Sequence, residues 1–261
     1  MDALLKRNAH KLHGIVNGID TELFDPEHDP AIPHHYTAAD PAPKALNKAA
    51  LRSVLGLRDE AAPLVALISR LYDQKGIDLI EQVMPALIHH GIQLAVLGTG
   101  ERRYEDMFRY HAAQNPGQVS ASVGFDHHLA QLLYAGSDMV LMASRFEPCG
   151  LGQLIGLRYG SIPVVRATGG LVDTVQDFDP ATGQGTGFMF EEYDPWALFG
   201  ALVRASETYR HRDIWDRLVR RAMSEDVSWA QSARRYVELY RAAMVSQRDR
   251  KGVLPSAHLV G

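Results

Sequence analysis

The 261-residue chain lacks several features that would place it in a specialised class. Its single cysteine, Cys149, excludes an internal disulfide and agrees with a reducing compartment. There is no run of about 18 apolar residues, so we predict no membrane span. The 27 basic and 31 acidic residues give a net charge of −4, which argues against a nucleic-acid-binding protein with a strongly basic face. Because the N-terminus has no apolar signal segment, we expect a cytoplasmic protein.

Common nucleotide and metal motifs are also missing. The sequence contains no G-x-x-x-x-G-K-[ST] loop, and Gly98-x-Gly100 is followed by Arg103 where a dinucleotide fingerprint needs a small residue. Asp177-Phe178-Asp179 has the spacing of an Asp-x-Asp metal site, but we interpret it as a plain acidic loop beside a proline. Three histidine pairs lack the H-E-x-x-H spacing and are interpreted as surface residues: His34-His35, His89-His90 and His127-His128. We therefore expect no metal and no cofactor.

From Pro63 onward, short β-branched runs alternate with longer amphipathic stretches. This alternation is typical of βαβ units, and it predicts an α/β fold with a doubly wound, Rossmann-like parallel sheet. In such sheets ligands bind at the carboxyl ends of the strands, so the loops there should carry the chemistry. The predicted strands are 64–68, 93–97, 119–123, 139–142, 162–165 and 187–190.

Helices are predicted between and after these strands. Asp126 and Asp194 are suitable N-caps, and Pro195 fits the first position of a helix. Residues 25–43 hold five prolines and predict an irregular segment. The predicted helices cover 78–87, a stretch from 101, a stretch from 126, 151–159, a stretch from 194, 211–224 and 228–245.

The loop after the first strand carries Arg70 and Lys75, followed by Gly76. Arginine offers a planar fork of donors and lysine a point charge, so the two could clamp a phosphate. A pair of solvated surface charges explains the spacing equally well. Gly76 favours the clamp slightly, because it lets the chain turn close to a ligand.

The loop after the fourth strand runs from Ser144 to Leu151. Free backbone amides before a helix could hold an anion or a sugar hydroxyl, and Glu147 could accept hydrogen bonds. The alternative is a simple strand-to-helix turn in which Glu147 stabilises the helix dipole. We interpret Cys149 as a small buried residue rather than a nucleophile, since no histidine neighbours it in sequence.

A third glycine-containing turn, Thr168-Gly169-Gly170, follows the fifth strand. Its two glycines expose backbone N–H groups and Thr168 adds a hydroxyl, which suits a phosphate. A structural turn explains the glycines alone equally well. Three such loops on successive strand ends favour a common ligand site.

Together these loops resemble the bacterial glycogen synthases and plant starch synthases, which are ADP-glucose-dependent retaining glucosyltransferases of the GT-B fold. The similarity runs from about residue 10 to 245. The segments that carry it are His13–Asp20, Ser69–Leu71, Gln74–Gly76, Gly98–Glu101, Ser144–Leu151, Gln153–Gly160, Pro163–Arg166 and Thr168–Leu171.

The resemblance implies a role for each matching residue. Arg70 and Lys75 would grip the diphosphate of ADP-glucose, and Glu147 would contact the transferred glucose. Since the family is understood to use same-face transfer assisted by the leaving phosphate, Glu147 is assigned to positioning and charge stabilisation rather than to nucleophilic attack. Arg70, Lys75 and Glu147 are thus the expected catalytic residues.

Further contacts follow from the same resemblance. Asn17 would reach toward the sugar, and Phe125 would stack beside the adenine where the family often has tyrosine. The amides of Cys149, Gly150, Leu151, Thr168, Gly169 and Gly170 would complete the phosphate and sugar site.

Family members are roughly twice as long, and their N-terminal domain carries a Lys-x-Gly-Gly motif, a histidine of the catalytic site and most acceptor contacts. The chain therefore resembles an isolated C-terminal half, inactive without the missing N-terminal domain. We expect it to act with that partner on an α-1,4-glucan, in the cytoplasm, or in a plastid if it comes from a plant or alga. A non-catalytic nucleotide-sugar-binding module and a UDP-sugar transferase are the alternatives.

The expected domain organisation is one donor-binding domain over residues 1–246. Residues 1–60 enter from the interdomain region, 61–225 form the core, and 226–246 form a helix that crosses back to the other half. A flexible tail, 247–261, should follow.

Overall fold

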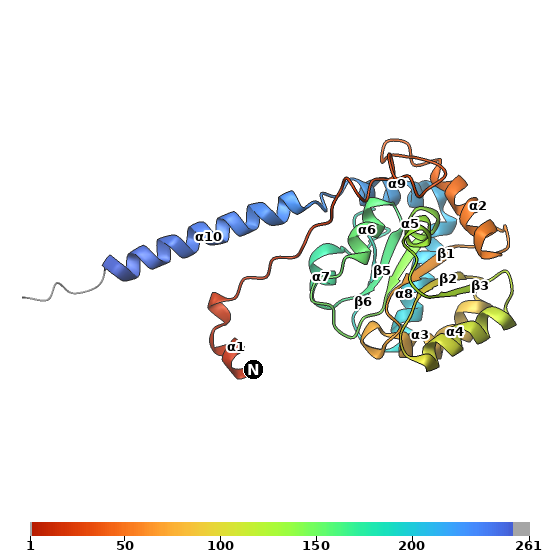
Figure 1. The fold of residues 1–261 in the computed structure, drawn as a ribbon, viewed down its shortest axis with the longest axis horizontal. Helices are drawn as coiled ribbons and strands as arrows, with labels where there is room; N and C mark the ends of the chain where they lie inside the picture. The colour runs from red at the N-terminus through yellow and green to blue at the C-terminus, as the bar shows by residue number, and fades with distance from the viewer. Residues whose placement is uncertain (1, 253–261) are drawn as a thin grey trace, which may run out of the picture.

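All six predicted strands form one parallel sheet in the computed structural model, which describes residues 2–252 (Figure 1). The strand order is β3-β2-β1-β4-β5-β6. Because β4 lies on the opposite side of β1 from β2, the winding direction reverses there, which confirms the doubly wound fold. The strands are β1 (Leu64–Ile68), β2 (Gln93–Gly98), β3 (Val119–Val123), β4 (Met139–Met142), β5 (Ile162–Arg166) and β6 (Phe188–Phe190).

The apolar strands are buried because helices cover both faces of the sheet, as parallel sheets require. Alternate residues of β1 point to different cores: Leu64 and Ala66 join a cluster with Leu51, while Val65 and Leu67 join the larger one. On one face α2 packs against α5, and on the other α3 packs against α8. The sheet is thereby fixed between two helical layers.

The helices follow the predicted pattern closely. Asp126 caps α5 by accepting from the Leu129 N–H, and Asp194 caps α8, which starts at Pro195. The helices are α1 (Asp2–Arg7), α2 (Lys44–Leu55), α3 (Ile77–His89), α4 (Arg102–Gln114), α5 (His127–Gly136), α6 (Gly152–Arg158), α7 (Gly170–Thr174), α8 (Pro195–Arg210), α9 (Arg212–Met223) and α10 (Trp229–Gly252), with 3-10 turns η1 (Ala9–Lys11) and η2 (Asp73–Lys75).

Several segments differ from expectation. The region before residue 61 contains two unpredicted helices, α1 and α2, and the turn after β5 leads into a third, α7, whereas 25–43 is irregular as predicted. Helix α10 continues to Gly252, so residues 247–252 of the expected tail are helical. The physical reason is that 246–251 contains neither glycine nor proline and is rich in arginine, lysine and glutamine, which are good helix formers. The rest of the expected tail, 253–261, lies outside the described residues.

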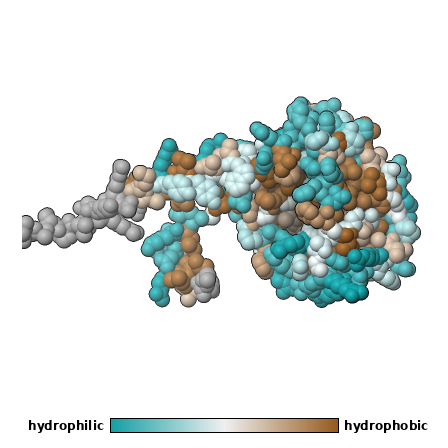
Figure 2. All heavy atoms as spheres, viewed as in Figure 1, coloured by the Kyte–Doolittle hydropathy of each residue, from teal (hydrophilic) through white to brown (hydrophobic). Residues whose placement is uncertain are grey.

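The N-terminal segment and the start of α10 lie side by side. The Ile19 N–H donates to the carbonyl of Val227 (2.9 Å), and the Ser232 hydroxyl donates to the carbonyl of Val16 (2.8 Å). Beyond this contact both segments project away from the sheet (Figure 1), and apolar side chains are visible on them (Figure 2). None of the helices in the described part of the chain has the length and apolar content needed to span a membrane.

Candidate functional site

The loops after β1 and β4 lie against each other at the carboxyl end of the sheet. The Arg145 N–H donates to the carbonyl of Gln74 (2.8 Å), which joins the two loops directly. Gly76 has a left-handed φ of 72°, and a Cβ there would lie 2.0 Å from the carbonyl oxygen of Ala143. Only glycine fits this contact, so the two loops can approach closely enough to share a site.

An ion pair joins two of the predicted catalytic residues. The ammonium of Lys75 lies 2.5 Å from the Glu147 carboxylate, and the Ser144 hydroxyl donates to the same oxygen (2.9 Å). The side chains of Lys75 and Glu147 are only 18% and 10% exposed, so solvent screens this pair weakly. Each side chain therefore fixes the position of the other.

Arg70 lines the same cavity of about 270 Å³ as Lys75 and Glu147. Its guanidinium lies 5.9 Å from the ring of Tyr72, and no carboxylate of the described residues pairs with it. Gly150 and Leu151 also line this cavity. Five predicted site residues are thus brought together, with one cation available to a ligand.

Backbone N–H groups of the loop after β4 are also available. Those of Cys149, Gly150 and Leu151 donate to no acceptor within residues 2–252. Gln153 fixes the position of this loop. Its buried amide donates to the carbonyls of Cys149 (3.1 Å) and Gly150 (3.0 Å) and to the Thr174 hydroxyl (3.0 Å). This arrangement can bind a phosphate or hydroxyl oxygen.

The predicted phosphate-binding role of the turn after β5 needs correction, because two of its three backbone N–H groups donate to carbonyls of the chain. The Gly170 N–H donates to the carbonyl of Glu147 (3.0 Å), and the Thr168 N–H donates to a carbonyl two residues earlier (2.9 Å). A Cβ on Gly169 would lie 2.1 Å from the Glu147 carbonyl oxygen, and one on Gly170 would lie 2.4 Å from that of Cys149. The glycines therefore pack this turn beneath the neighbouring loop, and of the three amides only that of Gly169 remains available within the described chain.

Supporting residues that the sequence did not reveal hold the loop after β1. The Asp73 carboxylate accepts from the Tyr104 hydroxyl and from Arg103 (2.5 Å). The Tyr193 hydroxyl donates to Asp78 (2.5 Å). Burial, reinforced by this hydrogen bond, raises the pKa of Tyr193 to about 12, so its hydroxyl stays protonated and can donate. These contacts come from distant segments, and no local motif indicates them.

Asn17 and Phe125 do not line the cavity. The Asn17 N–H donates to the sulfur of Cys149 (3.3 Å), which places it behind the amide loop and beside a smaller cavity. Phe125 is 80% exposed, and its ring meets that of His127 edge-on at 4.5 Å. Their roles toward sugar and adenine stay predictions, as does the role of Cys149, which is half-buried.

The Asp-x-Asp motif is occupied by contacts within the chain. Asp177 pairs with Arg204 (3.1 Å) and accepts from the Met189 N–H (2.7 Å). Asp179 accepts from the Ala181 N–H (2.9 Å). This supports the interpretation as an acidic loop.

Elsewhere, Asp25, Glu27 and His28 have ligand atoms close enough to share a metal ion. Asp25, however, already pairs with His28 (2.7 Å) and with Arg158 (2.7 Å). The group does not line the cavity of Lys75 and Glu147.

The sequence profile of the family described as Glycosyl transferases group 1 matches residues 51–221. The chain is 50% identical to a glycogen synthase from Desulforudis audaxviator over 254 residues, which covers 97% of this chain and 51% of that protein. It is 51% identical to a glycogen synthase from Anaeromyxobacter dehalogenans over 92% of this chain and 51% of that protein. The chain thus spans about half the length of the curated relatives it matches.

Comparison with solved structures finds the same fold. The catalytic domain of starch synthase IV from Arabidopsis thaliana, bound to ADP and acarbose, matches with a TM-score of 0.85 and 38% identity over 92% of this chain and 50% of that one. Sucrose-phosphate synthase from Thermosynechococcus elongatus matches with a TM-score of 0.63 and 22% identity over 94% of this chain and 56% of that one, which supports the fold alone.

Proposed function

Because the chain belongs to the group 1 glycosyl transferases, we propose that it is the donor-binding half of a retaining glucosyltransferase that uses ADP-glucose. The observation that carries the proposal is the shared cavity in which Arg70, Lys75 and Glu147 meet. The similarity to glycogen synthases supports glucose as the transferred sugar, and the starch synthase neighbour supports ADP as the nucleotide.

In this proposal the diphosphate lies against Arg70, Lys75 and the free amides of residues 149–151. No carboxylate within the described chain competes for Arg70, so its donors can go to phosphate oxygens. Phe125, exposed within the β3–α5 connection, offers its ring to the adenine, and Asn17 approaches the sugar from behind Cys149.

Transfer breaks the bond between glucose C1 and the diphosphate oxygen and forms a bond from C1 to an acceptor hydroxyl oxygen. The acceptor proton passes to the departing phosphate oxygen on the same face. Negative charge grows on the diphosphate, so fixed cations stabilise the transition state more than the ground state. Removing one such positioned donor typically costs about 10²- to 10³-fold in rate.

Glu147 acts by positioning in this scheme. Its carboxylate is neutralised by Lys75 and also accepts from Ser144, which makes it a weak nucleophile. The same contacts fix its orientation, so it can accept hydrogen bonds from the hydroxyls of the glucose.

Calorimetry with ADP tests the binding site. The wild-type chain should bind ADP saturably, and Arg70→Gln should weaken binding at least tenfold. Arg102→Gln is the matched control, because Arg102 is exposed on α4, pairs with Asp106 and does not line the cavity. Absent ADP binding, or equal binding by both variants, would refute the proposed site, and stronger binding of UDP than of ADP would favour a UDP-sugar transferase.

Activity is tested by supplying the missing half. The chain should elongate a maltooligosaccharide from ADP-glucose when mixed with the N-terminal half of the Desulforudis audaxviator glycogen synthase. The full-length relative serves as the positive control. ADP binding without elongation in any mixture would instead support a non-catalytic nucleotide-sugar-binding module.

A further inference from the structure

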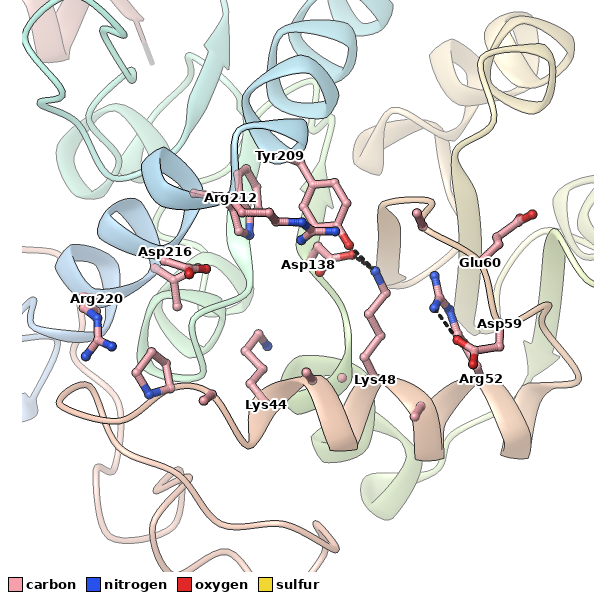
Figure 3. Close-up of a pocket in the computed structure, with 18 residues that line it drawn as sticks. Lys44, Lys48, Arg52, Asp59, Glu60, Asp138, Tyr209, Arg212, Asp216 and Arg220 are labelled. Carbon is pink, nitrogen blue, oxygen red and sulfur yellow. Dashed lines mark hydrogen bonds and ion pairs between the residues drawn. The ribbon is translucent and has the colours of Figure 1, made fainter.

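A second cavity, of about 440 Å³, is drawn in Figure 3. It is lined by residues that precede β1 and β4, which places it at the amino ends of these strands, at the other end of the sheet from the candidate active site. Asp138, which precedes β4, lies in its wall and accepts from the Leu64 N–H at the start of β1 (2.7 Å). Helix α2 forms one side of the cavity, and the end of α8 together with α9 forms the other. The proposed transfer reaction uses none of these residues.

Two of the cations in this cavity are satisfied by carboxylates. Lys48 pairs with Asp138 (2.6 Å) and also donates to the Tyr209 hydroxyl (2.6 Å). Arg52 pairs with Asp59 (3.1 Å). Figure 3 shows both pairs along α2. These residues hold α2 to the rest of the domain and are not available to a ligand.

Lys44 differs, because no carboxylate in the described part of the chain pairs with it. Its side chain is buried, and its ammonium donates to the carbonyls of Tyr134 (3.1 Å) and Ala135 (2.9 Å). An ammonium has three donors, so one remains. In Figure 3 the Lys44 side chain extends from α2 into the space facing α9.

Two arginines on α9 also lack a carboxylate partner among the described residues. The Arg212 guanidinium lies 3.7 Å from the centre of the Tyr209 ring, and Arg220 donates to the carbonyls of Ala38 and Ala39. Asp216 is the remaining carboxylate on this side, since the other acid of the wall, Glu60, pairs with Arg58 (3.6 Å). Among the described residues of the wall, three basic side chains without a carboxylate partner therefore stand against one unpaired carboxylate.

We propose that this cavity binds a small dianion, namely a phosphate group, either free or as the monoester of a small metabolite. Lys44 and Arg212 would be its ligands, with Arg220 at the edge of the cavity (Figure 3), because an arginine fork matches phosphate oxygens and an anion would offset the unpaired positive charge of the wall. Trp215 and Val219 add apolar wall for the organic part of an ester. The volume lies within the usual range of small-molecule sites.

The protonation state of Lys44 should make binding at this site depend on pH. A neutral amine has two donors, which suffice for its two carbonyl partners, whereas the ligand needs the third proton of the ammonium. Burial lowers the pKa of Lys44 to about 7, with Asp138 opposing and Lys48 reinforcing the change. The ring of Tyr36 also faces the Lys44 ammonium, which lies 5.8 Å from the centre of the ring. Binding of a dianion should therefore weaken as the pH rises above neutrality.

Calorimetry on the full chain tests the site, with inorganic phosphate and fructose 6-phosphate as probes. The background variant R70Q/K75M excludes binding at the other end of the sheet. In this variant, both probes should still bind saturably. The probe that binds more tightly shows whether the site prefers free phosphate or a phosphate monoester. Arg212→Gln should weaken binding at least fivefold. Arg217→Gln should change it less than twofold, because Arg217 is exposed on the same helix outside the cavity and pairs with Asp213.

Sulfate, which remains a dianion across this range, isolates the titration of Lys44. Its affinity should fall severalfold from pH 6 to pH 8.5, and Lys44→Met should remove both most of the affinity and its pH dependence. No saturable binding of any probe in R70Q/K75M, or equal affinities for Arg212→Gln and Arg217→Gln, would overturn the proposal.

Discussion

The ammonium of Lys75 and the carboxylate of Glu147 lie 2.5 Å apart, although 72 residues separate them in sequence. The pair forms because β1 and β4 are neighbours in the sheet and their following loops leave its carboxyl end together. A charge pair at this point keeps a cation beside the proposed diphosphate and a carboxylate beside the proposed sugar.

Lys75→Met and Glu147→Gln should affect ADP binding differently. Lys75→Met removes a phosphate ligand and leaves Glu147 as an unpaired carboxylate close to the diphosphate, so affinity should fall at least tenfold. Glu147→Gln releases the Lys75 charge toward the ligand, so affinity should be kept or increased. Calorimetry checks both, and an equal loss in the two variants would contradict separate roles.

Gly76→Ala should strongly destabilise the fold. Gly76 and Gly56 both have left-handed backbones, with φ of 72° and 66°, but a Cβ on Gly56 meets nothing within 4 Å. Gly56→Ala should therefore cost only about 1–2 kcal/mol for the backbone conformation. Gly76→Ala adds a clash with the Ala143 carbonyl and should cost several kcal/mol more. Urea unfolding measures the difference, and similar losses would show that the loops can separate freely.

Phe125→Ala should weaken ADP binding without loss of stability. The ring is 80% exposed, so its removal uncovers little core. Stacking of a base on an aromatic ring is worth about 1–3 kcal/mol, which corresponds to at least a fivefold loss of affinity. Phe125→Tyr should retain binding, and Tyr110→Ala, at another exposed aromatic, should have no effect. Unchanged affinity in Phe125→Ala would remove this residue from the site.

Stability should rise with pH because of Lys44. Its pKa is about 7 in the folded chain against an ordinary 10.5, so between these values the unfolded chain holds a proton that the folded chain lacks. Raising the pH through this window favours the folded state. From pH 7 to pH 8.5, the free energy of unfolding should increase by about 1–2 kcal/mol more in the wild type than in Lys44→Met. Urea titrations at both values check this, and parallel pH profiles would contradict it.

The chain alone should self-associate through α10. Tyr236, Val237 and Tyr240 are exposed on this helix, and exposed apolar patches favour association. Sedimentation equilibrium should show a molar mass that increases with concentration. Replacing Tyr236 and Tyr240 by serine should reduce this increase, and a clean monomer at high concentration in the wild type would contradict the prediction.

Much of the fold could be predicted because strands buried on both faces have a plain sequence signal. Runs such as 64–68 and 139–142 are wholly apolar and short, and capping residues such as Asp126 mark the helices between them. Helix α2 was missed because it follows a proline-rich segment and exposes much of its surface, which weakens its apolar pattern.

The site was predictable only in part. Arg70, Lys75 and Glu147 could be located because each follows a strand, but their pairing depends on which strands are neighbours. Gly169 and Gly170 were interpreted as sources of free amides, whereas their main effect is to admit the carbonyls of Glu147 and Cys149. A local sequence pattern does not indicate which distant backbone a glycine will meet.

The glycine contacts between the loops also limit how this protein can be altered. Gly76 lies against the chain at the end of β4, and Gly169 lies against the carbonyl of Glu147. The loops after β1, β4 and β5 therefore depend on one another for their positions. A residue inserted into any one of them would displace the other two. Natural or engineered shifts in nucleotide preference should therefore arise by side-chain exchange at fixed loop length.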